Sequence, residues 1–226
     1  MNYKTFNIVV SGVGGQGVIL ATEILGDAAL SEGLDVTISE IHGMAHRGGS
    51  VVSHVRIGSE AYSPTITEGE ADVILGFEPI ETLRVLRFAN KETRIIMNSK
   101  QIIPLAVSTG AYKYPSIEQI TEQCKTFTEH VTVLDAFKIA GEAGNPKTAN
   151  VVLLGALTAT GLLPIKEEDL IQAIKRHVPE RSVSENLNAF HAGKAALRRE
   201  MLNSQDSDTT FQRSRPTATE SSDCSS

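Results

Sequence analysis

The stretch NIVVSGVGGQG, residues 7–17, places a short apolar run directly before a cluster of glycines. The apolar residues at its start predict a buried strand over residues 7–10. Apolar residues then recur at helical spacing from Gln16 to Leu30, and Gly33 follows where a helix commonly ends. A strand, a glycine turn and a helix in this order are typical of the first unit of an open α/β sheet.

Alternating strands and helices continue along the chain. Residues 51–57 show a period of two, which is typical of a strand with one face against a core. Four further strands are predicted at residues 36–41, 73–77, 95–98 and 131–134. Helices are predicted over residues 79–88, after an N-cap at Ser116, over residues 150–160, and between Pro164 and Pro179. This alternation predicts an α/β fold class: a three-layer α/β/α arrangement with a mostly parallel, Rossmann-like sheet.

The domain organisation follows from length and composition. The chain has 226 residues, enough for one hydrophobic core. Residues 1–202 are therefore predicted to form a single domain. Residues 203–226 are rich in Ser and Thr and have almost no apolar side chains, so we expect a disordered polar tail.

Charge and hydropathy exclude two classes of partner. Lys and Arg number 21 against 27 Asp and Glu, so the net charge of −6 argues against a nucleic-acid partner. The sequence contains no apolar run long enough to span a bilayer, so no membrane partner is expected. The N-terminal segment does not have the pattern of a secretory signal, and a cytoplasmic location is therefore expected.

The cysteines limit the metal chemistry. Cys124 and Cys224 are the two cysteines of the chain, and they lie far apart. A cubane iron–sulfur cluster needs about four thiolates and a structural zinc site about four ligands. The chain by itself is therefore expected to hold neither.

The first candidate site is the glycine turn. Glycines after a strand let the backbone approach a phosphate, and the free N–H groups of the following helix bind anions. Two other interpretations stay open: a dinucleotide site with Glu40 on the ribose, or a tight turn that only packs the helix on the strand. The candidate ligand-binding residues are Gly12, Gly14, Gly15, Gln16 and Gly17.

The second candidate site is the glycine-rich segment after the second predicted strand. It could lie at the same edge of the sheet as the first turn, and Arg47 could pair with a carboxylate or phosphate. His42 and His46 are four apart, but no third ligand is evident, so no metal site is predicted. A plain glycine-rich connector remains the alternative. The candidate residues are His42, Arg47, Gly48, Gly49 and Ser50.

No catalytic residue is predicted. Ser53 and His54 are neighbours in a predicted strand and therefore point to opposite faces, which excludes a direct Ser–His pair.

Four stretches carry a resemblance to a known family. They are GVGGQGVILA from Gly12, EIHGMAHRGGSVVSHVRIG from Glu40, SPTITEGEADVILGFEPIETLR from Ser63 and ENLNAFHAGKAAL from Glu185. Over roughly residues 5–200 the chain resembles the gamma-domain family of 2-oxoacid:ferredoxin oxidoreductases. Within that family, GFEPIETLR and EIHGMAHRGGS resemble the small subunits of the aryl-specific, indolepyruvate branch.

The resemblance implies an accessory subunit that is inactive in isolation. Its complex would oxidatively decarboxylate arylpyruvates to aryl-acetyl-CoA, with coenzyme A as co-substrate and ferredoxin as electron acceptor. Thiamine diphosphate, Mg²⁺ and the iron–sulfur clusters would reside in a large partner subunit, and this chain would bind no cofactor firmly. The two glycine segments are then expected to contact coenzyme A or the partner. The alternatives are a gamma subunit for pyruvate, 2-oxoglutarate or a branched-chain 2-oxoacid, and a stand-alone dinucleotide-binding oxidoreductase.

Overall fold

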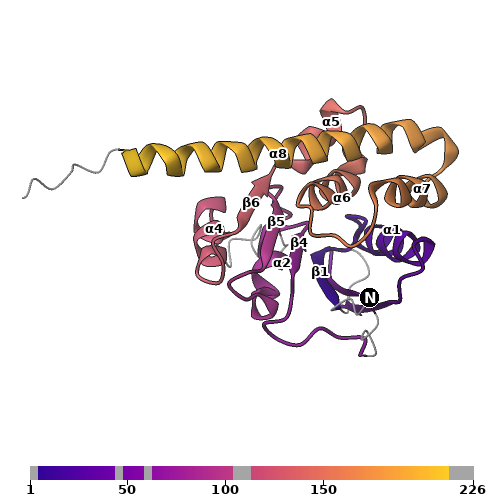
Figure 1. Cartoon of the computed structure of the whole chain (residues 1–226), viewed down its shortest axis with the longest axis horizontal. Helices are drawn as coiled ribbons and strands as arrows, with labels where there is room; N and C mark the ends of the chain where they lie inside the picture. Colours follow the sequence, from indigo (N-terminus) through magenta and orange to yellow (C-terminus); the bar gives the residue numbers. More distant parts are fainter. Residues whose placement is uncertain (1–4, 44–47, 59–62, 104–112, 214–226) are drawn as a thin grey trace, which may run out of the picture.

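The computed structural model describes residues 5–43, 48–58, 63–103 and 113–213 (Figure 1). For His42 and residues 204–213 it describes the backbone only. Six strands form one sheet in the order β2-β3-β1-β4-β5-β6. The strands are β1 (Phe6–Val13), β2 (Val36–His42), β3 (Ser50–Ile57), β4 (Val73–Gly76), β5 (Arg94–Asn98) and β6 (Val131–Leu134).

The sheet is mostly parallel, as predicted. β1 pairs parallel with β4, β4 with β5, and β5 with β6. β3 runs antiparallel to both β1 and β2, so among the described strands it alone opposes the direction of the others. The sequence pattern locates all six strands but does not place β3 between β1 and β2, because strand order depends on pairings between distant residues.

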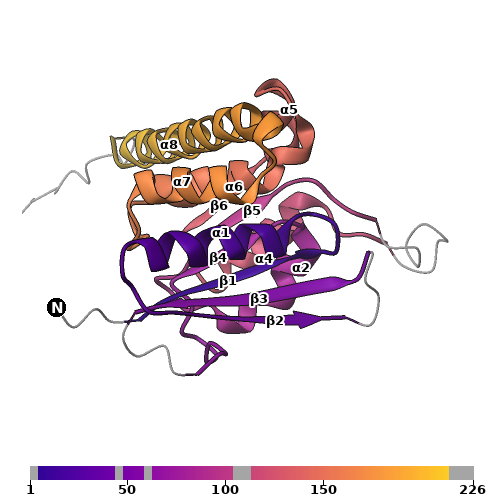
Figure 2. The ribbon, with the colours of Figure 1, turned by 90° about the vertical axis from the view of Figure 1, so that its right-hand side faces the viewer.

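Helices cover both faces of the sheet, which confirms the predicted α/β/α arrangement (Figure 2). One face carries α1 (Val18–Ser31), α6 (Ala149–Ala159) and α7 (Glu167–His177), with α8 (Val183–Arg213) packed on α6. The other face carries α2 (Pro79–Arg84) and α4 (Ile117–Lys125). The shorter elements are η1 (Leu86–Phe88), α5 (Ala136–Glu142), η2 (Pro146–Thr148) and η3 (Glu180–Ser182).

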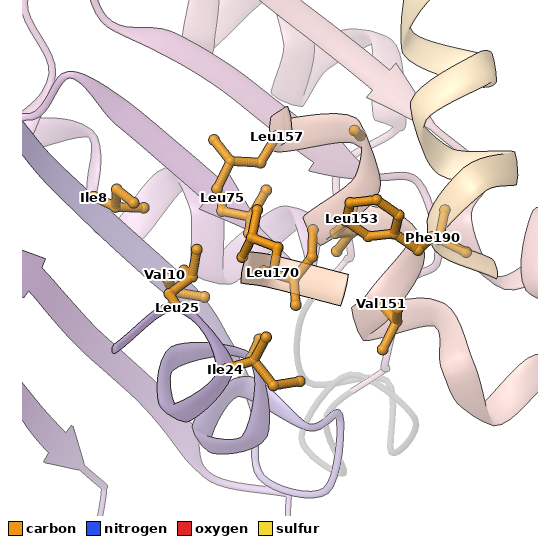
Figure 3. Packing of buried hydrophobic residues seen from close by; sticks show 14 of the residues in the cluster. Ile8, Val10, Ile24, Leu25, Leu75, Val151, Leu153, Leu157, Leu170 and Phe190 are labelled. Carbon is orange, nitrogen blue, oxygen red and sulfur yellow. The ribbon is translucent and has the colours of Figure 1, made fainter. Parts of the chain in front are cut away.

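The strand β1 supplies side chains to two separate cores. Ile8 and Val10 lie in the larger cluster with Leu25, Leu153 and Phe190, which Figure 3 shows from close by. Val9 belongs to the smaller cluster beneath α2 and α4. Because successive side chains of a strand point to opposite faces, one apolar run is buried on both sides.

Two predicted helices differ in detail from their patterns. The helix predicted over residues 79–88 ends at Arg84 and continues as the 3₁₀ turn η1, since Val85 leaves the helical region with ψ of 4°. The predicted N-cap at Ser116 is confirmed as a complete capping box with Gln119.

The last helix extends beyond the predicted domain boundary. α8 continues to Arg213, past residue 202, and residues 214–226 lie outside the described residues. The single domain ending at residue 202 and the disorder of residues 203–226 therefore stay predictions.

The helices α6 and α8 cross at backbone contact. A Cβ atom on Gly155 would lie 1.9 Å from the carbonyl oxygen of Phe190, and one on Gly193 would lie 1.9 Å from that of Val152. Any larger residue at either position would force one of the two helices to shift. The close crossing fixes α6, whose first turn borders the carboxyl edge of the sheet.

Candidate functional site

The glycine turn between β1 and α1 is braced by a glutamine. The side-chain oxygen of Gln16 accepts a hydrogen bond from the Val13 N–H (2.7 Å), and its amide group donates to the Phe77 carbonyl (2.9 Å). Both polar ends of this side chain therefore hold the turn against the end of β4. Gln16, predicted as a ligand-binding residue, has a structural role that accounts for its presence.

The glycines of the turn fall into two kinds. A Cβ atom on Gly12 would lie 2.8 Å from Val18 Cγ2, and one on Gly17 would lie 2.6 Å from the amide nitrogen of Asn150. These two glycines are required for close packing. Gly15 is exposed, its φ is 103°, and no described atom lies within 4 Å of where its Cβ would stand. Gly15 is therefore the position of the turn at which a ligand or partner could approach.

The structure brings the two predicted glycine segments together. The Gly14 N–H donates to the Gly49 carbonyl (2.8 Å), and the Gly48 N–H donates to the Gly14 carbonyl (3.4 Å). Because β3 is antiparallel, its first residue Ser50 lies beside Val13 at the carboxyl end of β1. Arg47 lies outside the described residues, and the side chain of His42 is likewise not described. Ligand binding by this paired surface stays a prediction.

The strand order argues against the dinucleotide interpretation of the turn. In that arrangement the acidic residue ends the strand beside the glycine turn. Here β3 separates β2 from β1, and Glu40 is level with Ser53 and Val10 across the sheet. At about 4.8 Å between neighbouring strands, the β2 backbone lies about 10 Å from β1.

One buried carboxylate contacts the second glycine segment, and another caps the helix α2 that carries the first. The Ser50 hydroxyl donates to Glu81 Oε2 (2.5 Å), and Arg84 Nε lies 3.4 Å from Glu81 Oε1. The side chain of Glu78 is buried and caps α2 by accepting from the Glu81 N–H (3.0 Å). Sequence reasoning did not identify these glutamates as part of the site. The available signal was Glu78 directly before Pro79, a pattern typical of a helix start.

Tyr114 completes this network. Its hydroxyl donates to Glu78 Oε1, which also accepts from the Ile102 N–H (3.1 Å). Burial, followed by the hydrogen bond to Glu78, raises the pKa of Tyr114. The phenol therefore keeps its proton and ties the segment after β5 to α2.

Two further reactive side chains among the described residues, Cys124 and His54, are buried. Burial raises the pKa of Cys124 to about 11, so its thiol is not a nucleophile at neutral pH. Burial, and then Arg87 and Arg56, lower the pKa of His54, whose Nδ1 accepts from the Ile66 N–H (3.1 Å). His54 contacts Phe88 of the smaller core, while Ser53 lies on the opposite face, as the strand pattern predicts.

Two properties of the described part of the chain bear on metal and membrane partners. No group of three or more His, Cys, Asp or Glu side chains there could hold a metal ion. None of the described helices combines the length and the apolar character needed to cross a bilayer. The described site offers backbone groups at an open turn, an arrangement suited to holding a ligand in position.

Comparisons with known proteins agree with this fold. A family model described as pyruvate ferredoxin/flavodoxin oxidoreductase matches residues 7–196. The chain is 44% identical over 201 residues to indolepyruvate oxidoreductase subunit IorB of Pyrococcus horikoshii, covering 88% of this chain and 99% of the relative. It is 42% identical over 200 residues to the subunit of the same name from Thermococcus kodakarensis, covering 88% and 98%.

A solved structure shows the same arrangement of elements. The gamma subunit of a keto/oxoacid ferredoxin oxidoreductase from Geobacter sulfurreducens superposes with a TM-score of 0.62 at 26% identity. The match covers 85% of this chain and 98% of that subunit.

Proposed function

The chain belongs to the pyruvate ferredoxin/flavodoxin oxidoreductase family, and we propose that it is the small subunit of an indolepyruvate:ferredoxin oxidoreductase. The observation that carries this proposal is 44% identity over almost the whole length of an indolepyruvate oxidoreductase subunit. The complex oxidatively decarboxylates arylpyruvates, captures the acyl group on coenzyme A and passes the electrons to ferredoxin. A cytoplasmic location is part of the same proposal.

Within the complex the chain is an accessory subunit. A cubane iron–sulfur cluster needs about four thiolates, whereas this sequence has 2 cysteines, and burial keeps the Cys124 thiol protonated. The residues of this chain therefore do not fit such a cluster. The larger partner subunit supplies thiamine diphosphate, Mg²⁺ and the clusters.

The paired glycine segments, residues 12–17 and 48–50, form the surface through which this chain acts. Support comes from the Gly14–Gly49 hydrogen bond, the exposure of Gly15 and the anchoring of Ser50 by Glu81. Backbone N–H groups at an open turn suit an anionic ligand such as coenzyme A. The same surface could instead pack against the large subunit.

The overall proposal is tested by arylpyruvate- and coenzyme A-dependent reduction of a viologen dye. The arms are this chain alone, a candidate thiamine-diphosphate-binding large subunit alone, and both together. Activity only in the mixture is expected. Activity of the large subunit alone would reduce this chain to a stabiliser, and activity only with pyruvate, 2-oxoglutarate or branched-chain 2-oxoacids would move the chain to another branch of the family.

The role of the glycine segments is tested by Gly15→Val. We expect complex assembly to survive while the apparent KM for coenzyme A rises. The control is Gly161→Val, since Gly161 also has a positive φ (70°) and an open Cβ position but lies outside the glycine segments. Loss of assembly with Gly15→Val alone would assign the surface to subunit packing, and no effect on either property would remove it from the proposal.

A stand-alone dinucleotide-dependent oxidoreductase is the alternative from another class. It requires the isolated chain to bind a nicotinamide or flavin. Titration of the full chain with both cofactors separates the two proposals, and binding of either would contradict the accessory role.

A further inference from the structure

A cavity of about 430 Å³ lies where β1, β4 and β5 end. Its lining includes Gly15 and Gln16 after β1, Phe77 and Asn98 at the ends of β4 and β5, and the first turn of α6. β1 connects through α1 to the β2 side of the sheet, whereas its neighbour β4 continues toward β5 and β6. Such a change of direction is where open α/β sheets bind ligands, and the volume lies within the usual range of about 300–1,000 Å³ for ligand sites.

Two lysines give the cavity a positive charge. Lys100 follows β5 and Lys147 lies in η2, and both line the cavity. The described lining residues include no carboxylate, although the chain as a whole has a net charge of −6. Glu78 contacts the lining residue Ile102, but its carboxylate already accepts hydrogen bonds from Ile102, Tyr114 and Glu81.

Backbone dipoles add to this positive field. The helix α6 begins at the cavity, and its N-cap Thr148 offers no side-chain cap to the first N–H groups. Asn150, in the first turn of α6, is buried, and its amide nitrogen lies 3.5 Å from the Gly17 carbonyl. The start of α6 is thus fixed beside the start of α1, with the positive ends of both helix dipoles near the cavity.

Part of the lining is apolar and aromatic. It consists of Phe77, Ile102 and Leu153 together with Phe137, which is 44% exposed. The Lys100 ammonium group lies 5.2 Å from the centroid of the Phe137 ring. A cation beside an exposed ring offers a charge contact and a flat apolar contact at the same place.

We propose that this cavity is a binding site for an organic anion with a flat ring, held at its anionic group by Lys100 and Lys147 and at its ring by Phe137. Two sources share this chemistry: the nucleotide portion of an acyl-carrier cofactor, and an arylacetate or arylpyruvate. The inference rests on the proposed function only for the choice of these two ligands. The lining residues named here all belong to this chain.

The test is isothermal titration of the full chain with two anions and their uncharged counterparts. Adenosine 3′,5′-bisphosphate is compared with adenosine, and indole-3-acetate with indole. We expect at least one anion to bind, and Lys100→Ala and Lys147→Ala each to weaken its binding by about tenfold, the effect of losing one charge-assisted contact. The matched control is Lys91→Ala, because Lys91 is an exposed lysine that precedes β5 at the opposite edge of the sheet.

The outcome decides the proposal without reference to enzyme activity. Binding of the bisphosphate alone assigns the site to the nucleotide, and binding of indole-3-acetate alone assigns it to the aryl acid. Absence of binding by both anions up to about 1 mM would overturn the proposal. So would binding that Lys91→Ala weakens as much as the two cavity substitutions. Because the titration uses this chain alone, its failure is distinguishable from failure of the dye-reduction test.

Discussion

At Gly155, where α6 crosses α8, a Cβ atom would lie 1.9 Å from the Phe190 carbonyl oxygen, whereas at Gly15 it would meet no described atom within 4 Å. The first glycine removes a side chain so that two helices touch. The second permits a φ of 103° and leaves open surface above the sheet. The comparison teaches that one residue type can serve two purposes: glycine lets two helices touch at Gly155, and it leaves the surface open at Gly15.

The largest effect is expected at Gly155, where the α6–α8 crossing is tight. Gly155→Ala forces the Phe190 backbone away, and the free energy of unfolding should fall by about 3 kcal/mol or more. Denaturant unfolding followed by circular dichroism measures it. The control is Gly141→Ala in α5, where a Cβ atom meets nothing within 4 Å and the helix should become more stable by about 0.5–1 kcal/mol. Equal stability of the two variants would refute a tight α6–α8 crossing.

The next largest loss of stability is expected at Asn98, a buried amide at the end of β5. Asn98 donates to the Phe77 carbonyl (3.1 Å) and accepts from the Ala136 N–H (3.0 Å). Asn98→Leu leaves that buried N–H without its partner, so we expect a loss of about 2 kcal/mol in the free energy of unfolding. Asn90→Leu is a comparison at the exposed, opposite end of β5. If Asn98→Leu lowers the free energy of unfolding no more than Asn90→Leu does, the hydrogen bonds of Asn98 do not contribute the expected stability.

Substitution of Gly15 should lower the free energy of unfolding by less than Gly155→Ala or Asn98→Leu does. Gly15→Ala has space for its methyl group but must adopt a positive φ, which costs about 1–2 kcal/mol. The same unfolding measurement applies. A loss above that of Gly155→Ala would contradict the contrast between close contact and open surface.

A second helix pair sharpens the comparison because charge rather than backbone contact joins it. Between α1 and α7, Arg176 donates to Asp27 (2.8 Å), and His177 lies 3.2 Å from the same carboxylate. The hydrogen bond from Arg176 lowers the pKa of Asp27. Because the carboxyl pKa is lower in the folded state, the ionised carboxylate stabilises the folded protein at pH values above the unfolded pKa of about 3.9. That stabilisation is lost as the pH falls through the folded-state pKa.

Asp27→Asn should therefore cost less than about 1 kcal/mol at neutral pH, since the pair is partly exposed. Unfolding of wild type and variant from about pH 7 to about pH 3 should show the difference shrinking toward the acid end. A difference that grows with acidity would have the wrong sign for this pair.

The smallest effect is expected where α8 leaves the body of the protein. Among the described side chains of α8, the last fully buried apolar one is Leu197, and Leu202 is 63% exposed. Truncation after residue 202 should change the free energy of unfolding by no more than about 0.5 kcal/mol. A loss above about 1 kcal/mol would show that residues 203–226 belong to the folded domain.

Much of the fold could be predicted from local pattern. The capping box at Ser116, the period of two over residues 51–57 and the apolar run before Gly12 each lie within a few residues of chain. The candidate site was predicted less completely. Its glycine segments could be identified, but Glu78, Glu81 and Tyr114 could not. A side chain that is buried in the fold and one that is exposed look alike in sequence.

The sequence by itself determined the succession of strands and helices and the glycine turn, because periodicity and turn chemistry are local properties. The tertiary structure alone decided three further features: the insertion of β3 between β1 and β2, the pairing of Gly14 with Gly49, and the gathering of Lys100 and Lys147 around one cavity. Each depends on contacts between residues that are far apart in the chain. Such contacts form only when the hydrophobic faces of all the elements are buried together.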